Sequence, residues 1–300
     1  MPYNLITILG PTAAGKTKLA ARLAKEFDGE IISADSRQVY CGMDIGTGKD
    51  FEDYIVNGNK IPFHLIDIID PAEEFDLYKF NELFYKSFNE IRERSRLPFL
   101  VGGTGLYINS ILQGYRLRKA AFSPESIKLL RKFSIEELRE KLSGLNPALH
   151  NTTDLLDKER LIKAIIIAES TDKNIPERPE INSLTIGIAL PRAEIKRRIT
   201  ERLKKRLQTG MIEEVEKLLQ NGITHDKLIF LGLEYKYISL YLQGKLNYND
   251  MFQKLNSAIH NFAKRQVTWF RKMEKEGTKI NWINGPDFEE AKSIIEKSIK

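Results

Sequence analysis

Near its N-terminus the chain carries the stretch Gly10-Pro11-Thr12-Ala13-Ala14-Gly15-Lys16-Thr17, which matches G-x-x-x-x-G-K-[ST], the pattern of a phosphate-binding loop. The run Asn4–Leu9 before it is short and β-branched, as in a buried parallel strand. Residues 17–27 after it have apolar positions at helical spacing. A strand and a helix are the neighbours this loop requires, because its backbone N–H groups, the helix N-terminus and the lysine bind phosphate together. We predict a phosphate site here, with the Thr17 hydroxyl available to Mg²⁺.

Further strands and helices alternate along the chain. Strands are expected at residues 30–34, 63–69, 99–101 and 184–190, and helices at residues 77–94, 192–220 and 255–275. Alternation of this kind predicts an α/β fold, a parallel sheet flanked by helices as in P-loop NTPases. Residues 124–170 have helical periodicity and no convincing strand. We therefore expect a catalytic core over residues 1–114 and 184–300 and a mostly helical insertion domain over residues 115–183.

The composition of the 300 residues is that of an ordinary globular protein, with 42% hydrophobic and 29% charged residues. One cysteine, Cys41, excludes an internal disulfide, and no run approaches the ~18 apolar residues of a membrane span. The N-terminus has no basic region or cleavage site of a signal peptide. We expect a cytoplasmic protein with no membrane partner.

The positive charge is concentrated in one segment. The chain has 47 Lys and Arg against 41 Asp and Glu, a net charge of +6. Residues 192–206 hold eight basic and two acidic residues, 8 − 2 = +6, so the rest of the chain is neutral. Such a patch is the usual footprint of a phosphate or nucleic-acid site, although a solvated helix face remains the alternative.

Two other segments follow predicted strands. Asp35 stands just past the carboxyl end of a strand next to the phosphate loop, at the edge where open α/β sheets bind ligands. Its position fits three alternative roles: a general base, a metal ligand through water, or the N-cap of the next helix. The segment Gly102–Tyr107 follows another strand and offers glycines for close backbone approach and the hydroxyl of Thr104. The pattern of a P-loop alone favours a small-molecule or nucleotide kinase.

Six segments, in their order and spacing, closely resemble the tRNA dimethylallyltransferase family. They are Gly10–Thr17, Asp35–Tyr40, Met43–Thr47, His64–Asp67, Val101–Tyr107 and Ala263–Arg271. The resemblance extends over most of the chain. It implies transfer of a dimethylallyl group from dimethylallyl diphosphate to N6 of the adenosine immediately 3′ of the anticodon, with release of diphosphate.

The resemblance also implies roles for individual residues. Asp35 is expected to be the general base, with Thr104, Lys16 and Arg198 as further catalytic residues. Arg202 lies four positions from Arg198 and so on the same helix face, and we prefer Arg198 for the diphosphate. The expected diphosphate-binding set is Gly10, Pro11, Thr12, Ala13, Ala14, Gly15, Lys16, Thr17 and Arg198. Mg²⁺ on Thr17 is the expected cofactor.

tRNA is the expected macromolecular partner, bound through its anticodon stem-loop by what we expect to be a monomer. The expected tRNA-binding residues are Asp35, Ser36, Arg37, Gln38, Thr104, Glu159, Arg160, Leu161, Ile162 and Lys163. Three alternatives remain open: an adenylate isopentenyltransferase acting on free AMP, a P-loop kinase, and a tRNA-binding protein without catalysis. Transfer to AMP, phosphate transfer from ATP, or binding without turnover would distinguish them.

Overall fold

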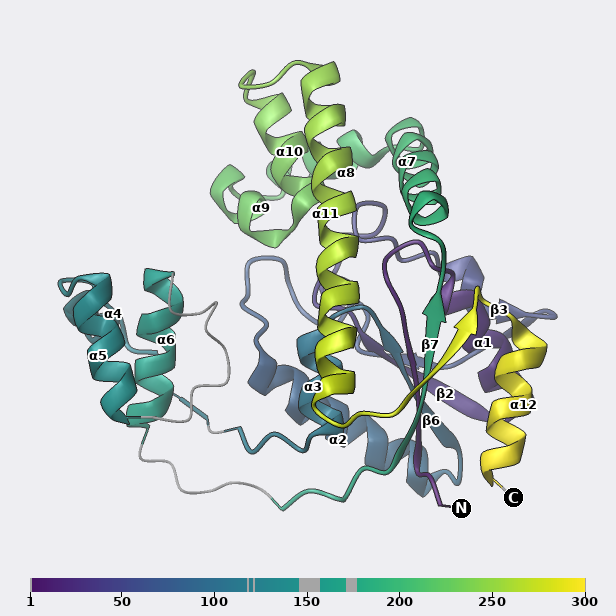
Figure 1. Cartoon of the computed structure of the whole chain (residues 1–300). Helices are drawn as coiled ribbons and strands as arrows, with labels where there is room; N and C mark the ends of the chain where they lie inside the picture. Colours follow the sequence, from purple (N-terminus) through teal and green to yellow (C-terminus); the bar gives the residue numbers. More distant parts are fainter. Residues whose placement is uncertain (1, 118, 121, 146–156, 171–176, 300) are drawn as a thin grey trace. The chain divides into compact units, whose positions relative to one another are not determined.

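The structure is a computed structural model that describes residues 2–117, 119–120, 122–145, 157–170 and 177–299 (Figure 1). The chain divides into two compact units, one of residues 1–114 and 180–300 and one of residues 115–179. None of the helices that the structure describes has both the length and the apolar character needed to cross a membrane.

The larger unit is built on a parallel sheet whose described strands run in the order β5-β2-β6-β1-β7-β8. Their bounds are β1 Leu5–Leu9, β2 Gly29–Ala34, β5 Phe63–His64, β6 Leu97–Gly102, β7 Ser183–Ala189 and β8 Ile280–Asn284. β1, β2 and β6 are buried along their whole length, which explains their nearly continuous apolar sequences. The short pair β3 (Ile55–Val56) and β4 (Asn59–Lys60) forms a separate antiparallel hairpin.

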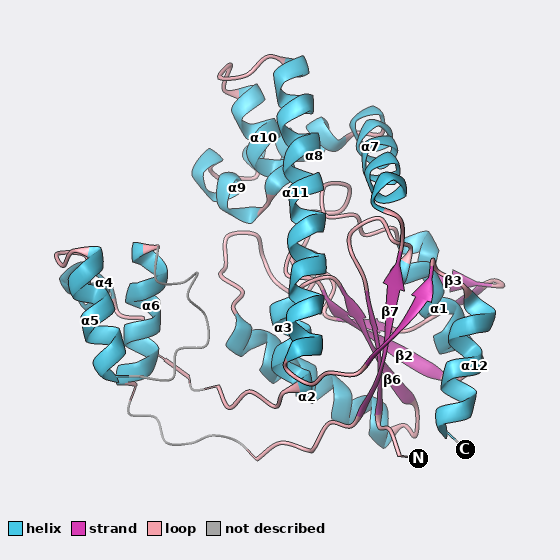
Figure 2. Cartoon of the chain, in the orientation of Figure 1, coloured by secondary structure: helices cyan, strands magenta, loops and turns pink. Residues whose placement is uncertain are grey.

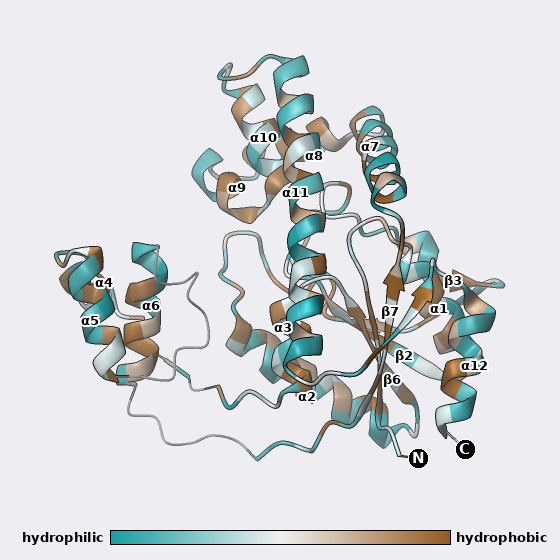
Figure 3. Cartoon of the chain, in the orientation of Figure 1, coloured by the Kyte–Doolittle hydropathy of each residue, from teal (hydrophilic) through white to brown (hydrophobic). Residues whose placement is uncertain are grey.

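Helices cover both faces of the sheet (Figure 2). α1 (Lys16–Glu26) and α12 (Phe288–Ile299) pack together on one face, with the core residues Ile6, Leu23 and Ile186 among them. The other face carries α2 (Leu77–Glu93), α3 (Gly105–Leu112) and the last turns of α11 (Tyr248–Lys275). In Figure 3 the strands are largely brown, because their side chains lie in these two apolar layers.

A cluster of helices extends beyond the carboxyl edge of the sheet (Figure 1). It consists of α7 (Arg192–Gln208), α8 (Met211–Gln220), α9 (His225–Leu231), α10 (Leu233–Leu242) and the first part of α11. Its own apolar core includes Leu203, Val215, Leu228, Tyr235 and Leu255. Val39, Tyr40 and Met43 belong to the same core, so the segment after β2 is packed against these helices.

The smaller unit contains α4 (Pro124–Leu130), α5 (Ile135–Leu145) and α6 (Lys158–Glu169). A small apolar core joins them and includes Leu138, Leu142, Leu161 and Ile165. The smaller unit begins at residue 115, as predicted, and ends at residue 179, whereas the sequence predicted its end at residue 183.

Three expectations about elements were wrong. The strand predicted over residues 63–69 is only Phe63–His64, because Leu65 and Asp67 have positive φ angles of 63° and 53° and leave the extended conformation. The helix predicted over residues 192–220 is broken at Gly210, whose φ of 104° separates α7 from α8. In the described sheet, β6 lies between β1 and β2, so the strand that carries Asp35 is not the immediate neighbour of β1.

Candidate active site

Three neighbouring strands end side by side at the carboxyl edge of the sheet. β1 leads into the phosphate loop, β6 into Gly103 and Thr104, and β2 into Asp35. Because β6 lies between the other two, the phosphate loop and Asp35 are separated by two strand spacings, roughly 10 Å. The edge therefore has room for a small phosphorylated molecule with its phosphates at β1 and its other end near β2.

The phosphate loop is held in shape by its own backbone and by a distant glutamine. Gly15 has φ 88° and stands directly before the first residue of α1, a left-handed conformation that glycine adopts at little cost. The Thr12 N–H donates to Gln266 Oε1 at 2.8 Å, and Gln266 Nε2 donates to the Gly103 carbonyl at 2.9 Å. Gln266 is almost fully buried in α11, and it links the loops after β1 and β6.

A cavity of about 270 Å³ opens beside the loop. Its lining includes the expected residues Thr12, Ala13, Gly15, Lys16, Thr17, Asp35, Gln38 and Arg198. Arg202, the alternative to Arg198 in the sequence, and Thr47, from the segment Met43–Thr47, also line the cavity. The sequence gave no reason to select five further lining residues: Ser33, Gly48, Asp50, Asp53 and Tyr54. Five of the eight predicted phosphate-loop residues and the predicted base therefore line one cavity, whereas Gly10, Pro11 and Ala14 do not line it.

Two cations in this cavity have lowered pKa values. Burial, followed by repulsion from Arg202, lowers the pKa of Lys16 to about 8, although the Asp35 carboxylate opposes the shift. Burial, followed by repulsion from Arg206, lowers the pKa of Arg202 to about 10. Both pKa values fall because the charged side chains are poorly hydrated and lie next to another cation. A bound anion would relieve both, which is the property expected of a diphosphate site.

Arg198 and Arg202, both in α7, make different contacts. Arg202 donates to Thr12 Oγ1, so its guanidinium contacts the phosphate loop. Arg198 Nε donates to Glu194 Oε1 at 2.6 Å, and its side chain is about one third exposed (34%). Both line the cavity. The sequence favoured Arg198 over Arg202 for binding the diphosphate. In the structure Arg202 contacts the phosphate loop directly, whereas Arg198 lines the cavity and is paired with the Glu194 carboxylate.

Asp35 is fixed by one of its two carboxylate oxygens. Oδ1 accepts from the N–H groups of Arg37 at 2.9 Å and Gln38 at 3.3 Å, which closes a turn after β2. Within the described part of the chain, Oδ2 has no hydrogen-bond partner. The carboxylate is thus oriented through one oxygen and free to accept a proton on the other.

The residues next to Asp35 are arranged around the same turn. Thr104 Oγ1 accepts from the Ser36 N–H at 3.2 Å, which brings the ends of β6 and β2 together and leaves the hydroxyl proton for a ligand. The Gln38 amide accepts from Ser33 Oγ at 3.3 Å and donates to the Gly48 carbonyl at 3.0 Å. The Arg37 guanidinium lies 5.7 Å from the ring centroid of Phe230, an exposed side chain of α9.

A carboxylate from α8 fixes the loop that carries Thr47 and Gly48 into the cavity. Glu214 accepts from three successive backbone N–H groups, those of Asp44 (2.8 Å), Ile45 (2.6 Å) and Gly46 (3.0 Å). It also accepts from the Tyr235 hydroxyl at 2.7 Å. A Cβ at Gly46 would lie 2.6 Å from that Tyr235 ring, so only glycine fits the position. The wall of the cavity thus depends on residues about 170 positions away.

We expect Glu214→Ala to lower the free energy of unfolding by about 3 kcal/mol, because three backbone donors lose their partner in a partly buried site. The measurement is urea unfolding. Glu213→Ala is the matched control: both glutamates lie in the first turn of α8 and share any helix-dipole term, but Glu213 is exposed. Equal stability of the two variants would contradict this role of Glu214.

The expected tRNA-binding residues of α6 lie in the smaller unit and fall into two groups. Leu161 and Ile162 are buried in the core of that unit, so we correct their assignment from tRNA contact to packing. Glu159 forms a two-pronged ion pair with Arg131 at 2.9 and 3.1 Å on the surface. Arg160 is exposed, and Lys163 Nζ lies 5.9 Å from the Phe122 ring centroid.

The described residues contain no cluster of three or more His, Cys, Asp or Glu side chains that would form a metal site by itself. Mg²⁺ is commonly held by one or two protein oxygens, with phosphate oxygens and water completing its shell. Thr17 and Asp53 line the cavity. Burial and the neighbouring Asp50 raise the pKa of Asp53, so this carboxylate would gain from a cation. The donor set fits Mg²⁺ bound together with a diphosphate.

These features define a class: an α/β protein whose phosphate loop, cations and oriented carboxylate share one cavity. The family described as IPP transferase matches residues 38–273, and the isopentenyl transferase family matches residues 3–68. The tRNA dimethylallyltransferase 1 of Geotalea uraniireducens is 52% identical over 98% of both chains. That of Geotalea daltonii is 53% identical over 95% of this chain and 92% of its own. The chain belongs to the IPP transferase family.

Solved structures agree with this assignment. The tRNA isopentenylpyrophosphate transferase of Bacillus halodurans is 36% identical, has a TM-score of 0.69, and is matched over 98% of this chain and 94% of its own. A eukaryotic dimethylallyltransferase described as acting on tRNA has a TM-score of 0.76 at 20% identity, over 99% of this chain and 77% of its own. At that identity the likeness shows the fold alone. The predicted α/β fold and family are confirmed.

Proposed function

We propose that the protein transfers a dimethylallyl group from dimethylallyl diphosphate to N6 of the adenosine 3′ of the anticodon in tRNA. The observation that carries the proposal is the shared cavity, in which Lys16 and Arg202 lie at the phosphate loop and Asp35 lines the same space. The spacing of roughly 10 Å between β1 and β2 suits a diphosphate at one end and the reacting carbon near the base. Family membership supplies the prenyl donor and the RNA acceptor.

The proposed reaction forms the C1–N6 bond, breaks the C1–O bond and transfers one proton. N6 of adenosine attacks C1 of the donor, the C1–O bond breaks, and diphosphate leaves with the bonding electron pair. The amine proton passes to Asp35 Oδ2, since Oδ1 is occupied by the Arg37 and Gln38 N–H groups. Backbone N–H groups of the loop, Lys16 and Arg202 stabilise the negative charge that develops on the leaving group. Arg198 reaches the same diphosphate once it leaves Glu194.

Two further groups have proposed roles. The Thr104 hydroxyl, held at the Ser36 N–H, orients the adenosine beside Asp35. Thr17 and Asp53 would hold Mg²⁺ with the diphosphate, and the ion would supply positive charge to the leaving group. Arg37 and the exposed residues of α6 are proposed RNA contacts. A single chain working in the cytoplasm is part of the same proposal.

The test is incubation with radiolabelled dimethylallyl diphosphate, Mg²⁺ and unmodified tRNA that has adenosine after the anticodon, with AMP as a parallel acceptor. Label in tRNA alone is the expected result. Label in AMP alone would indicate an adenylate isopentenyltransferase, and label in neither, with phosphate transfer from ATP, would indicate a kinase. tRNA binding without transfer by the folded protein would indicate a binding protein.

A further inference from the structure

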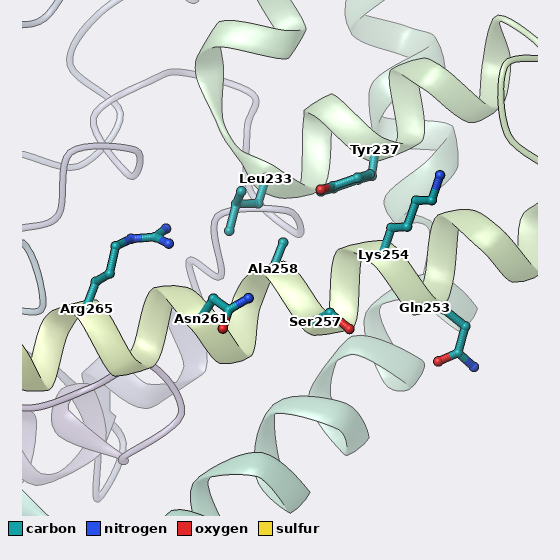
Figure 4. A pocket seen from close by; sticks show the side chains of 8 residues that line it. All are labelled: Leu233, Tyr237, Gln253, Lys254, Ser257, Ala258, Asn261 and Arg265. Atoms are coloured by element: carbon teal, nitrogen blue, oxygen red, sulfur yellow. The ribbon is translucent and has the colours of Figure 1, made fainter. Parts of the chain in front are cut away.

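A pocket of about 460 Å³ lies between α10 and α11, and it shares no lining residue with the catalytic cavity (Figure 4). Leu233 and Tyr237 come from α10. The remaining lining residues come from α11: Gln253, Lys254, Ser257, Ala258, Asn261 and Arg265. We call this feature the α10–α11 groove. Nothing in the proposed chemistry uses it.

The groove carries a positive charge that no acidic lining residue neutralises. Lys254 and Arg265 are its two cationic lining residues, and no lining residue is acidic. They are eleven residues apart, three helical turns and about 16 Å along one face of α11, and Figure 4 shows them at opposite ends. Neither side chain forms an ion pair with a described residue. A polyanion with charges spaced along the groove would match both.

The groove also offers groups suited to nucleobases. The exposed amides of Gln253 and Asn261 make no side-chain hydrogen bond within the described part of the chain. Tyr237 presents an aromatic ring, and Lys236 Nζ lies 5.7 Å from its centroid. Unpaired amides read base edges, an aromatic ring stacks on bases, and cations bind phosphates, which together are the usual means of binding single-stranded RNA. An acidic peptide would engage the cations and leave the other groups unused.

One end of the groove lies next to the catalytic cavity. Arg265 is followed in α11 by Gln266, whose amide contacts both the Thr12 N–H and the Gly103 carbonyl. Leu233 follows Gly232, and the Arg37 side chain reaches within 3.9 Å of where a Cβ at Gly232 would stand. The groove therefore begins beside the segments that surround Asp35 and leads away from them along α11.

We propose that the α10–α11 groove binds the single-stranded loop nucleotides that flank the target adenosine. The inference rests on the proposed function and extends it by naming a second RNA site. Lys254 and Arg265 contact phosphates, Tyr237 stacks on a base, and Gln253 and Asn261 bind base edges. A nucleotide extruded into the catalytic cavity leaves neighbours that need such a surface.

The test measures binding of an anticodon stem-loop RNA without donor. Tyr237→Ala should weaken binding about tenfold, the effect expected from loss of one stacked base. Lys254→Ala should reduce the slope of log K against log salt by about 1, for one lost phosphate contact. Lys217→Ala, which removes an exposed lysine of α8 outside the groove, should change neither quantity. In transfer assays, Tyr237→Ala and Lys254→Ala should raise KM for the RNA, and Lys217→Ala should leave kcat and KM at the wild-type values.

A second RNA locates the contact. It keeps the stem but closes it with four nucleotides, so that the flanking loop nucleotides are missing. Tyr237→Ala and Lys254→Ala should bind this RNA as the wild type does. The inference is overturned if both variants bind the full loop normally, if both RNAs lose affinity equally, or if polyglutamate displaces the loop as well as RNA does. A wild type that binds RNA but transfers no prenyl group would contradict the proposed function alone.

Discussion

Asp35→Asn should lower kcat by about 10²-fold or more while the affinity for tRNA stays near that of the wild type. The amide keeps an oxygen at the Oδ1 position, so the turn made with the N–H groups of Arg37 and Gln38 is preserved. What it loses is the ability to accept the N6 proton. Single-turnover transfer with saturating donor and tRNA measures the effect, and a filter-binding assay measures the affinity.

Two comparisons separate the chemical role of Asp35 from its structural one. Asp35→Ala should lose the same catalysis and, in addition, some affinity for RNA, because the turn loses its acceptor. Asp70→Asn is the matched control: Asp70 Oδ1 accepts from the Ala72 N–H at 2.7 Å in a similar turn away from the cavity, so its kcat should not change. A wild-type rate for Asp35→Asn would remove the residue from the role of base.

The sequence predicts those parts of the site that lie within one continuous segment of the chain. A phosphate loop is one continuous segment bounded by a strand and a helix, so Gly15, Lys16 and Thr17 were identifiable without a fold. Asp35 followed from the rule that ligands bind at the carboxyl ends of parallel strands. The i, i+4 spacing put Arg198 and Arg202 on one face, but only the packing of α7 shows that Arg202 contacts Thr12.

The parts that were missed depend on contacts between distant segments. Glu214 and Gln266 look like ordinary helix residues, and their roles come from pairing with backbone groups 163 to 254 positions away. Asp53 lies in the 3₁₀ turn Phe51–Tyr54 and reaches the cavity through that turn. The resemblance predicts an RNA contact at Leu161, but its apolar side chain belongs to the core of the smaller unit. Hydrophobic character alone would have corrected that residue.

Lys16→Met should lower kcat/KM for dimethylallyl diphosphate by about 10²- to 10³-fold, the loss typical when one donor to a developing negative charge is removed. Methionine keeps most of the apolar stem, so the change removes the charge and little of the packing. Lys18→Met removes an exposed lysine two positions later in α1 and should leave kcat/KM unchanged. Equal kinetics in the two variants would exclude Lys16 from donor binding.

The pH dependence of the wild type gives an independent test of the same residue. The pKa of Lys16 is lowered to about 8, so in the free enzyme its ammonium is present below pH 8 and is lost as the pH rises through that value. Donor affinity should therefore be constant below pH 8 and fall about tenfold per pH unit above it. Arg202, with a pKa of about 10, keeps its charge through this range and does not produce the break. Lys16→Met should abolish the break near pH 8, and a wild-type profile with no break near pH 8 would show that Lys16 is not desolvated in the free enzyme.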